Sequence, residues 1–205
     1  MQRQKENIKI TLKALEPSDV QTLLTWENNP NIWAISKTIE PFSKYKLETY
    51  IQQTLTSDVF GLRQLRLMIH HILDAELDIT EPIGTIELFD FDPINKHAGI
   101  GIMLQESKQG QGFGTIALDQ FLTYCFENLH LHSVYANISE TNTNSIKFFE
   151  NYGFTKVAEY KEFLFENNRF VSQLTYQLIN TSFPRRRESP NEGIAGQARN
   201  DDHNS

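Results

Sequence analysis

The sequence predicts an α+β fold, a single domain in which helices flank one central, twisted, mixed β-sheet. Strand-like stretches alternate irregularly with helical ones, and fourteen phenylalanines are enough for a sizeable apolar core. A length of 205 residues suits one domain. We expect this domain over residues 1–180 and a tail over residues 181–205. The predicted order is strand, two helices, three strands, a glycine loop, helix, strand, helix and two strands.

The first part of the chain is predicted to hold one strand and two helices. Residues 8–15 alternate between apolar and polar side chains, as in a half-buried strand. Pro17 and acidic neighbours then open a helix that stops before Pro30. We expect a loop over residues 33–41 and a second helix over residues 44–54.

Three strands are predicted in the middle of the chain. The first two cover residues 64–73 and 82–89, with an acidic turn between them. Residues 90–96 form the next hairpin connection, and residues 98–104 the third strand. This strand is rich in alanine and glycine, as expected where both faces are covered or another backbone approaches closely.

The remaining folded part is predicted to begin with a long helix over residues 112–129, where apolar side chains recur at helical spacing. After it we expect a strand at 134–138, a helix at 145–152 with Gly153 behind it, and a hairpin of strands 157–165 and 170–179. From Thr181 onward the chain is rich in proline, glycine, asparagine and charge, without periodicity. This composition predicts a disordered tail.

Composition excludes several classes of function. The net charge is −7 and the folded part has no basic stripe, so we do not expect a nucleic-acid partner. No apolar run reaches membrane-spanning length, and the N-terminal residues are polar, which indicates no membrane association and a cytoplasmic location. The single cysteine, Cys125, lies on an apolar helical stripe and is predicted to be a buried structural thiol. His70 and His71 are adjacent and face opposite sides of a strand, and no other cluster has metal-ligand spacing, so no metal site is expected.

Residues 109–115, Gln-Gly-Gln-Gly-Phe-Gly-Thr, carry the most informative motif. A glycine loop between a strand and a helix start can cradle a phosphate, because glycine lets the backbone approach closely and the first helical N–H groups point at the anion. No lysine follows Gly114, which excludes a Walker loop, and the glycine spacing does not fit a dinucleotide fingerprint.

The loop instead matches the pattern Gln-x-x-Gly-x-Gly, with Gln109, Gly112 and Gly114 in the defining places. This pattern resembles the pyrophosphate loop of the GCN5-related N-acetyltransferases, the GNAT family. The segment 142–154, Asn-Thr-Asn-Ser-Ile-Lys-Phe-Phe-Glu-Asn-Tyr-Gly-Phe, is similar to another motif of that family. Trp26-Glu-Asn-Asn-Pro resembles a segment of its ribosomal-protein and spermidine acetyltransferase branch. The resemblance covers roughly residues 8–180.

Three shorter stretches resemble the bacterial spermidine and diamine N-acetyltransferases in particular. They are Glu40-Pro41-Phe42, the strand that contains Glu87, and the hairpin from Glu162 to Arg169.

The resemblance implies that acetyl-coenzyme A is the co-substrate. The backbone of the strand before the loop would pair with the pantetheine arm, and the loop would surround the pyrophosphate. The residues implied in cofactor binding are Met103, Leu104, Gln105, Gln109, Gly110, Gln111, Gly112, Phe113, Gly114, Thr115, Asn142 and Ser145. For Asn142 a second interpretation stays open, because it could equally cap the helix that follows, and Ser145 could also cap it.

The acceptor side of the reaction is expected to use carboxylates. An alkylammonium has a pKa of about 10, so a base or a water chain must remove its proton before the amine attacks. Glu87 and Asp90 are candidates for the base, and the resemblance places a carboxylate at Glu87 beside the acceptor amine. The alternative is an ordinary solvated strand carboxylate. Glu40 is expected to bind a second cationic group of a polyamine.

One residue departs from the family pattern. Where the family frequently has a tyrosine that acts as general acid, this chain has Phe149, which cannot donate a proton. Either the proton comes from water or the ammonium, or another hydroxyl such as that of Tyr152 or Tyr160 replaces it, or the protein only binds the cofactor. Because Tyr152 points away from the Phe149 direction on a helix, packing is an alternative role for it.

The sequence therefore predicts an acetyl-coenzyme A-dependent N-acetyltransferase that acts on a primary amine of a small polyamine or diamine. Two alternatives stay open: acetylation of the N-terminal amine of a ribosomal protein, and a non-catalytic acyl-coenzyme A-binding module. Relatives in the family form dimers or larger rings, so a homo-oligomer is expected.

Overall fold

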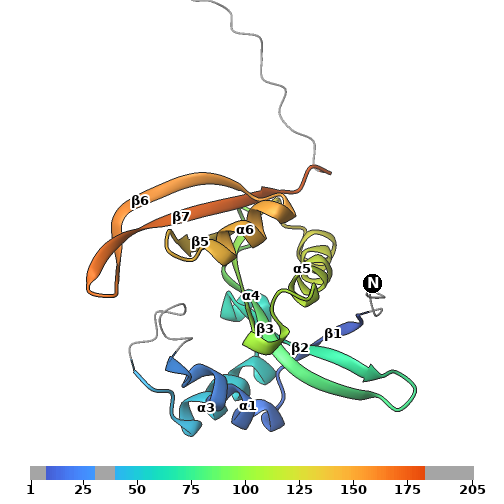
Figure 1. Ribbon diagram of the computed structural model, residues 1–205. Helices are drawn as coiled ribbons and strands as arrows, with labels where there is room; N and C mark the ends of the chain where they lie inside the picture. The colour runs from blue at the N-terminus through green and yellow to red at the C-terminus, as the bar shows by residue number, and fades with distance from the viewer. Residues whose placement is uncertain (1–7, 31–39, 183–205) are drawn as a thin grey trace, which may run out of the picture.

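One seven-stranded sheet organises the molecule (Figure 1). The structure is a computed structural model and describes residues 8–30 and 40–182. The strand order is β1-β2-β3-β4-β5-β7-β6, and every neighbouring pair is antiparallel except β4 and β5, which are parallel. The predicted α+β class with one mixed sheet is confirmed. The strands are β1 (Ile10–Ala14), β2 (Leu65–Asp74), β3 (Ile79–Asp92), β4 (His97–Leu104), β5 (Ser133–Ser139), β6 (Thr155–Glu166) and β7 (Arg169–Ile179).

Helical segments cover both faces of this sheet. Met68 and Ile69 are neighbours in β2 and fully buried, yet they belong to two separate apolar clusters. Because successive strand side chains point to opposite faces, each face has its own core. The larger cluster packs under α5 and α6, and the smaller one under α1 and α3. The helical segments are η1 (Pro17–Asp19), α1 (Val20–Glu27), α3 (Lys44–Thr56), α4 (Val59–Leu62), η2 (Glu106–Lys108), α5 (Phe113–Thr123), the π-helical turn η3 (Tyr124–Asn128) and α6 (Thr143–Tyr152).

The strand predicted over residues 82–89 is longer in the structure. β3 begins at Ile79, and the predicted turn shrinks to the residues after Asp74, whose side chain accepts hydrogen bonds from two following backbone N–H groups. Pro82 normally marks the start of a strand, because it lacks an N–H donor. Here a register shift places Pro82 opposite His70 and lets β3 continue past it.

Two further differences concern helices. The long helix predicted over residues 112–129 ends its α-helical part at Thr123 and continues as the π-helical turn. The short α4 was not predicted, because a single turn has too little periodicity to detect. Asp58 caps it by accepting a hydrogen bond from the N–H of Gly61 at 2.9 Å.

Two predictions concern segments that the structure does not describe. Most of the predicted loop over residues 33–41 and nearly all of the tail from residue 181 lie outside the described residues. In the described part, no helix has both the length and the apolar character needed to cross a membrane. Cys125 is buried as predicted, and burial raises the pKa of its thiol to about 12.

The first prediction tests the larger core. Phe121 of α5 is completely buried, so Phe121→Ala should lower the free energy of unfolding by about 3–5 kcal/mol. Phe163 of β6 is 59% exposed, and Phe163→Ala should cost less than about 1 kcal/mol. Urea unfolding followed by circular dichroism measures both changes. Equal losses in the two variants would contradict the assignment of the core.

Candidate active site

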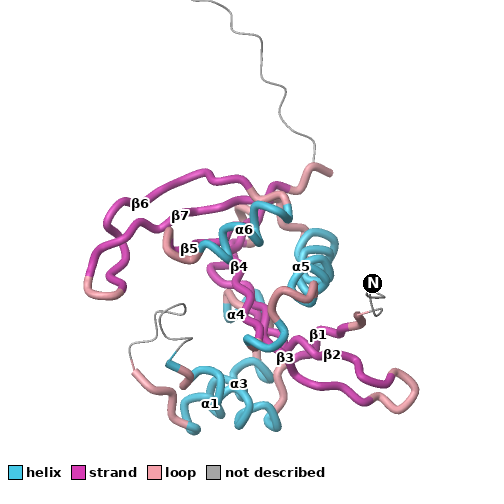
Figure 2. The backbone as a smooth tube through the Cα atoms, viewed as in Figure 1, coloured by secondary structure: helices cyan, strands magenta, loops and turns pink. Residues whose placement is uncertain are grey.

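The parallel strands β4 and β5 separate soon after they begin. Their pairing consists of His97 with Ser133, Ala98 with Val134 and Gly99 with Tyr135. β4 then continues to Leu104 and β5 to Ser139 without pairing with each other. The edge of β4 beyond Gly99 is therefore available for another extended group. Figure 2 shows β4 between an upper part of the molecule with β5, β6, β7 and α6 and a lower part with β1, β2, β3, α1 and α3.

The glycine loop lies at the end of this open edge. Gly110 and Gly112 have φ angles of +70° and +98°, in the left-handed region that favours glycine. Gly112 is the N-cap of α5, and no side chain caps this helix there. The first N–H groups of α5 are therefore available to an anion, which the helix dipole also favours.

The two glutamines of the loop hold its shape. The side-chain amide of Gln109 donates to the carbonyl of Leu104 at 2.9 Å, and that of Gln111 donates to the carbonyl of Ser107 at 2.6 Å. The first bond ties the loop to the end of β4, and the second ties it to η2. The two side chains thus shape the loop, and the contact of Gln109 and Gln111 with a cofactor stays a prediction.

The helix start is packed tightly against its surroundings. A Cβ atom on Gly114 would lie 3.3 Å from the ring of Phe148 in α6 and 3.4 Å from a methyl carbon of Leu104. Phe113 is buried, with its ring centroid 4.8 Å from that of His71. Only the backbone of Phe113 and Gly114 is thus positioned to contact a ligand, whereas the side chain of Thr115 is exposed.

The last residues of β4 are held by β3. Met103 pairs with Thr85, and the N–H of Gln105 donates to the carbonyl of Ile83 at 2.9 Å. The side chain of Gln105 donates to the carbonyl of Pro82 at 3.0 Å. These bonds hold β4 along the edge opposite the one that would receive the pantetheine arm, and they use the Gln105 side chain for structure.

Asn142 caps α6. Its side-chain oxygen accepts a hydrogen bond from the N–H of Ser145 at 3.1 Å. Of the two interpretations left open by the sequence, the capping role is present in the structure. The helix starts at Thr143, two residues earlier than predicted, and it ends at Gly153 in a left-handed conformation, as expected.

Glu87 lies where the two strands separate. It pairs with Gly101, two residues past the last β4–β5 pair, and a Cβ atom on Gly101 would lie 3.1 Å from Oε1 of Glu87. The carboxylate therefore extends over the backbone of β4, on the sheet face that carries α1 and α3. This location is compatible with the predicted contact between Glu87 and an acceptor amine.

Sequence reasoning missed the partner of Glu87. Nε of Arg66 in β2 lies 3.2 Å from Oε2 of Glu87, and Nη1 of Arg66 lies 2.8 Å from Oε1 of Glu27 in α1. Burial alone would lower the pKa of the Arg66 guanidinium, but Glu87 and Glu27 raise it above its ordinary value. The only signal in the sequence was an arginine inside an apolar strand.

Asp90 forms a second polar contact, beside the part of β4 and β5 that is still paired. It has a φ of +51° in a β-bulge, and its Oδ2 accepts a hydrogen bond from the hydroxyl of Tyr135 at 3.3 Å. Burial, and then the Asp90 charge, raise the pKa of Tyr135 to about 12. Tyr135 was not predicted as a site residue, because a tyrosine in an apolar strand is expected to belong to the hydrophobic core.

The hydroxyl of Tyr152 lies between α6 and α5. It donates to Oδ1 of Asp119 at 3.0 Å, and burial together with that contact raises the pKa of Tyr152 to about 12. Among the described residues, no hydrogen bond connects Tyr152 with Glu87 or Asp90. Phe149 is buried, with its ring 5.0 Å from that of Phe154.

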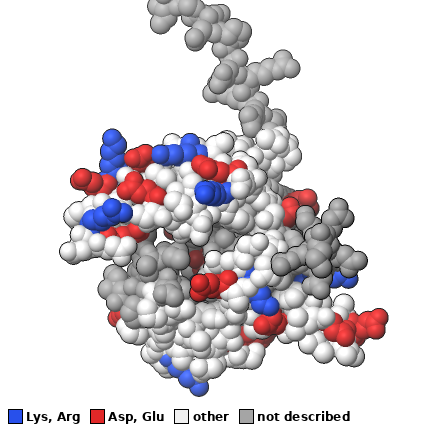
Figure 3. Space-filling model, in the orientation of Figure 1, with Lys and Arg blue, Asp and Glu red and all other residues white. Residues whose placement is uncertain are grey.

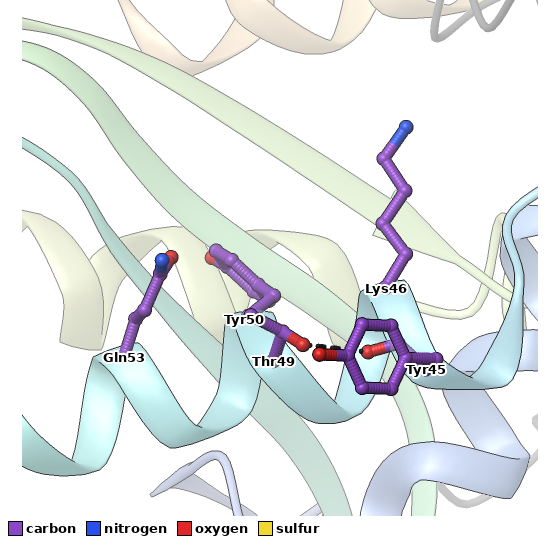
Figure 4. Close-up of a pocket in the computed structure, with 5 residues that line it drawn as sticks. All are labelled: Tyr45, Lys46, Thr49, Tyr50 and Gln53. Carbon is purple, nitrogen blue, oxygen red and sulfur yellow. Dashed lines mark hydrogen bonds between the residues drawn. The ribbon is translucent and has the colours of Figure 1, made fainter.

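Glu40 contacts Lys46, which lines a shallow hollow along α3. Its Oε1 accepts from Nζ of Lys46 at 2.9 Å, and this contact lowers the pKa of the exposed Glu40 carboxylate. Lys46, Tyr50 and Gln53 extend to the same side of α3 in Figure 4. The hollow has a volume of about 400 Å³ and is lined by Tyr45, Lys46, Thr49, Tyr50 and Gln53.

Tyr50 lines this hollow and also interacts electrostatically with Arg66, Glu87 and Glu27. Burial raises the pKa of Tyr50, the positive charge of Arg66 opposes this rise, and the charges of Glu87 and Glu27 add to it. Tyr50 is therefore close enough to sense all three charges. In the described ranges, 8–30 and 40–182, no three His, Cys, Asp or Glu side chains are grouped as metal ligands.

The surface shows no concentration of one charge above this region. Lys, Arg, Asp and Glu side chains are mixed over the β6–β7 hairpin (Figure 3).

Comparison with known proteins agrees with this geometry. A model of the GNAT acetyltransferase domain matches residues 9–155. The spermidine N(1)-acetyltransferase of Vibrio cholerae is 24% identical over 89% of this chain and 99% of its own length. An N-acetyltransferase 9-like protein of Nematostella vectensis is 33% identical over 52% of this chain and 57% of its own.

A solved structure shares the fold. The crystal structure of spermidine N-acetyltransferase from Vibrio cholerae in complex with CoA and spermine superposes with a TM-score of 0.72 and 26% identity. The match covers 83% of this chain and 95% of that one. Because the family model spans well over half of the sequence, this chain belongs to the GNAT family of N-acetyltransferases, which use acetyl-coenzyme A.

Proposed function

We propose that this protein transfers an acetyl group from acetyl-coenzyme A to a primary amine of a small polyamine or diamine. The single observation that carries the proposal is the place of the Glu87 carboxylate, over Gly101, where β4 and β5 have just separated. A carboxylate there can attract a cationic amine to the open edge on which the family positions its donor.

The residues around the open edge of β4 suit the binding of the acetyl donor. The edge of β4 beyond Gly99 offers backbone groups that an amide-containing arm could pair with, as an added strand would. The left-handed Gly110 and Gly112 and the uncapped start of α5 suit a pyrophosphate. Acetyl-coenzyme A supplies the activated acetyl group, and the chain holds it in place for attack.

The acceptor side requires a neutral amine at the moment of attack. A polyamine arrives protonated, so its charge favours approach to Glu87, and a proton must then leave. Glu87 is partly exposed, so it can take this proton directly or pass it to water. A backbone N–H on the open edge of β4 would stabilise the oxyanion that develops on the carbonyl oxygen.

The leaving sulfur needs a proton from another source than the usual tyrosine. Phe149 has no proton to give, and the hydroxyl of Tyr152 is engaged with Asp119. We infer that the acceptor amine or water supplies this proton. A thiol is a good enough leaving group for that route, because its pKa is only about 8.5 in a free cysteine.

The similarity to spermidine acetyltransferases supports a polyamine as first choice of acceptor. A second cationic group of such an acceptor would bind near Glu40, whose carboxylate contacts Lys46 in the lining of the hollow along α3. The expected homo-oligomer stays a prediction, because only one chain is described.

The direct test is a thiol-release assay with acetyl-coenzyme A and a panel of spermidine, short diamines, an aminosugar and short peptides. We expect turnover with spermidine or a diamine. Turnover with peptides alone would favour acetylation of a protein N-terminus. Coenzyme A binding at micromolar concentration without turnover of any amine would show a non-catalytic binding module.

The second prediction concerns Glu87. Glu87→Gln removes the charge and the base but keeps the shape, so kcat/KM for the amine should fall about 10²-fold or more. Coenzyme A affinity, measured by calorimetry, should stay within twofold of wild type. Glu76→Gln is the matched control, because Glu76 is exposed in the β2–β3 turn. A normal kcat/KM in Glu87→Gln would remove Glu87 from the site.

The third prediction concerns the glycine loop. Among the described residues, a Cβ atom on Gly112 would meet Ile8 alone, at 3.8 Å, so Gly112→Ala is expected to act through the left-handed φ. An L-residue there costs about 1–2 kcal/mol, which should weaken coenzyme A binding roughly tenfold by distorting the loop. Gly61→Ala in α4 is the control and should bind normally, because Gly61 lacks a positive φ. Unchanged affinity in Gly112→Ala would argue against this loop as the pyrophosphate site.

A further inference from the structure

A partly buried arginine, Arg66, connects Glu87 to a second carboxylate, that of the buried Glu27. The side chain of Glu27 is 7% exposed, that of Arg66 is 18% exposed and that of Glu87 is 39% exposed. The three charges thus form a row from the interior towards the surface. Only Glu87, at the outer end, is accessible enough to meet a ligand.

The three side chains come from three different elements. Glu27 is the last residue of α1, Arg66 lies in β2 and Glu87 lies opposite it in β3. Arg66 contacts Glu27 with Nη1 and Glu87 with Nε, so one planar guanidinium spans both carboxylates. The Nε contact is an ion pair that is not aligned as a hydrogen bond.

The charges in this row do not cancel. One guanidinium stands between two carboxylates, which leaves the cluster with one excess negative charge when both are ionised. A buried carboxylate such as Glu27 requires a close countercharge, and Arg66 provides it. The excess negative charge is therefore located at Glu87, where β4 and β5 separate.

We propose that Arg66 is a positioning residue for Glu87, and that Glu27 sets the charge that attracts the cationic acceptor. This inference rests on the proposed function. Arg66 fixes the Glu87 carboxylate over Gly101, which decides whether the amine is held in line for attack. Glu27 neutralises part of the positive charge of the Arg66 guanidinium. Glu87 therefore keeps its attraction for one ammonium group, although Glu27 itself does not touch the substrate.

The two roles predict opposite kinetic patterns. Glu27→Gln keeps the shape and an acceptor for Arg66 but makes the cluster neutral. KM for the amine should rise roughly tenfold while kcat stays within about twofold. Arg66→Lys keeps the charge but cannot span both carboxylates as a fork. Its kcat should fall roughly tenfold while KM for the amine stays within about twofold.

The controls separate these effects from misfolding and from net charge. Glu48→Gln removes one charge from an exposed pair with Lys44 on α3 and should change neither constant. KM for acetyl-coenzyme A and the melting temperature should remain near wild type in all variants. If Glu27→Gln does not fold, Arg66→Lys still tests the positioning role.

The outcomes distinguish this inference from the proposed function. If the wild type acetylates no amine, the proposed function fails. If the wild type is active but Glu27→Gln shows an unchanged KM for the amine, the charge role of Glu27 is wrong. An unchanged kcat in Arg66→Lys would likewise overturn the positioning role. Equal increases of KM for amine and for acetyl-coenzyme A would show a merely structural role.

Discussion

The site depends on the short pairing between β4 and β5. Three residue pairs hold the two strands together, and both strands then continue apart. The two strands cannot move together again within the sheet, because β4 is paired with β3 on its other edge and β5 is paired with β7 on its other edge. The gap between them is therefore part of the fold, and a backbone edge inside it remains available for a ligand. The glycine loop and the start of α5 close the end of this gap with N–H groups.

The two sides of the proposed reaction are held by different means. Backbone geometry makes the donor side: left-handed glycines, an uncapped helix start and an open strand edge. In our proposal, side-chain charge makes the acceptor side, through Glu87 and the Arg66–Glu27 pair behind it. This division explains why the donor can be common to a family while the acceptor changes. The backbone of the loop tolerates many side chains, whereas one changed carboxylate would alter the charge that an amine meets.

Local features were predictable from the sequence, and long-range contacts were not. The glycine loop follows from its own seven residues, and the facing of Glu87 follows from alternation along a strand. The contact of Arg66 with Glu27 depends on how α1 packs on β2, which no local pattern encodes. The start of β3 was missed because a bulge accommodates Pro82, and Tyr135 was missed because its partner Asp90 lies in another strand. The capping role of Asn142 could be stated only as an alternative, since capping and ligand contact use the same residue type.

A crystal structure with coenzyme A and spermidine would test the central claim most directly. We predict that the pantetheine arm lies along β4 between Gly99 and Leu104, and that one amine nitrogen lies within hydrogen-bond distance of the Glu87 carboxylate. The pyrophosphate should contact the backbone of Gly110 to Thr115. An arm bound elsewhere, or an amine held away from Glu87 with coenzyme A correctly placed, would contradict this account.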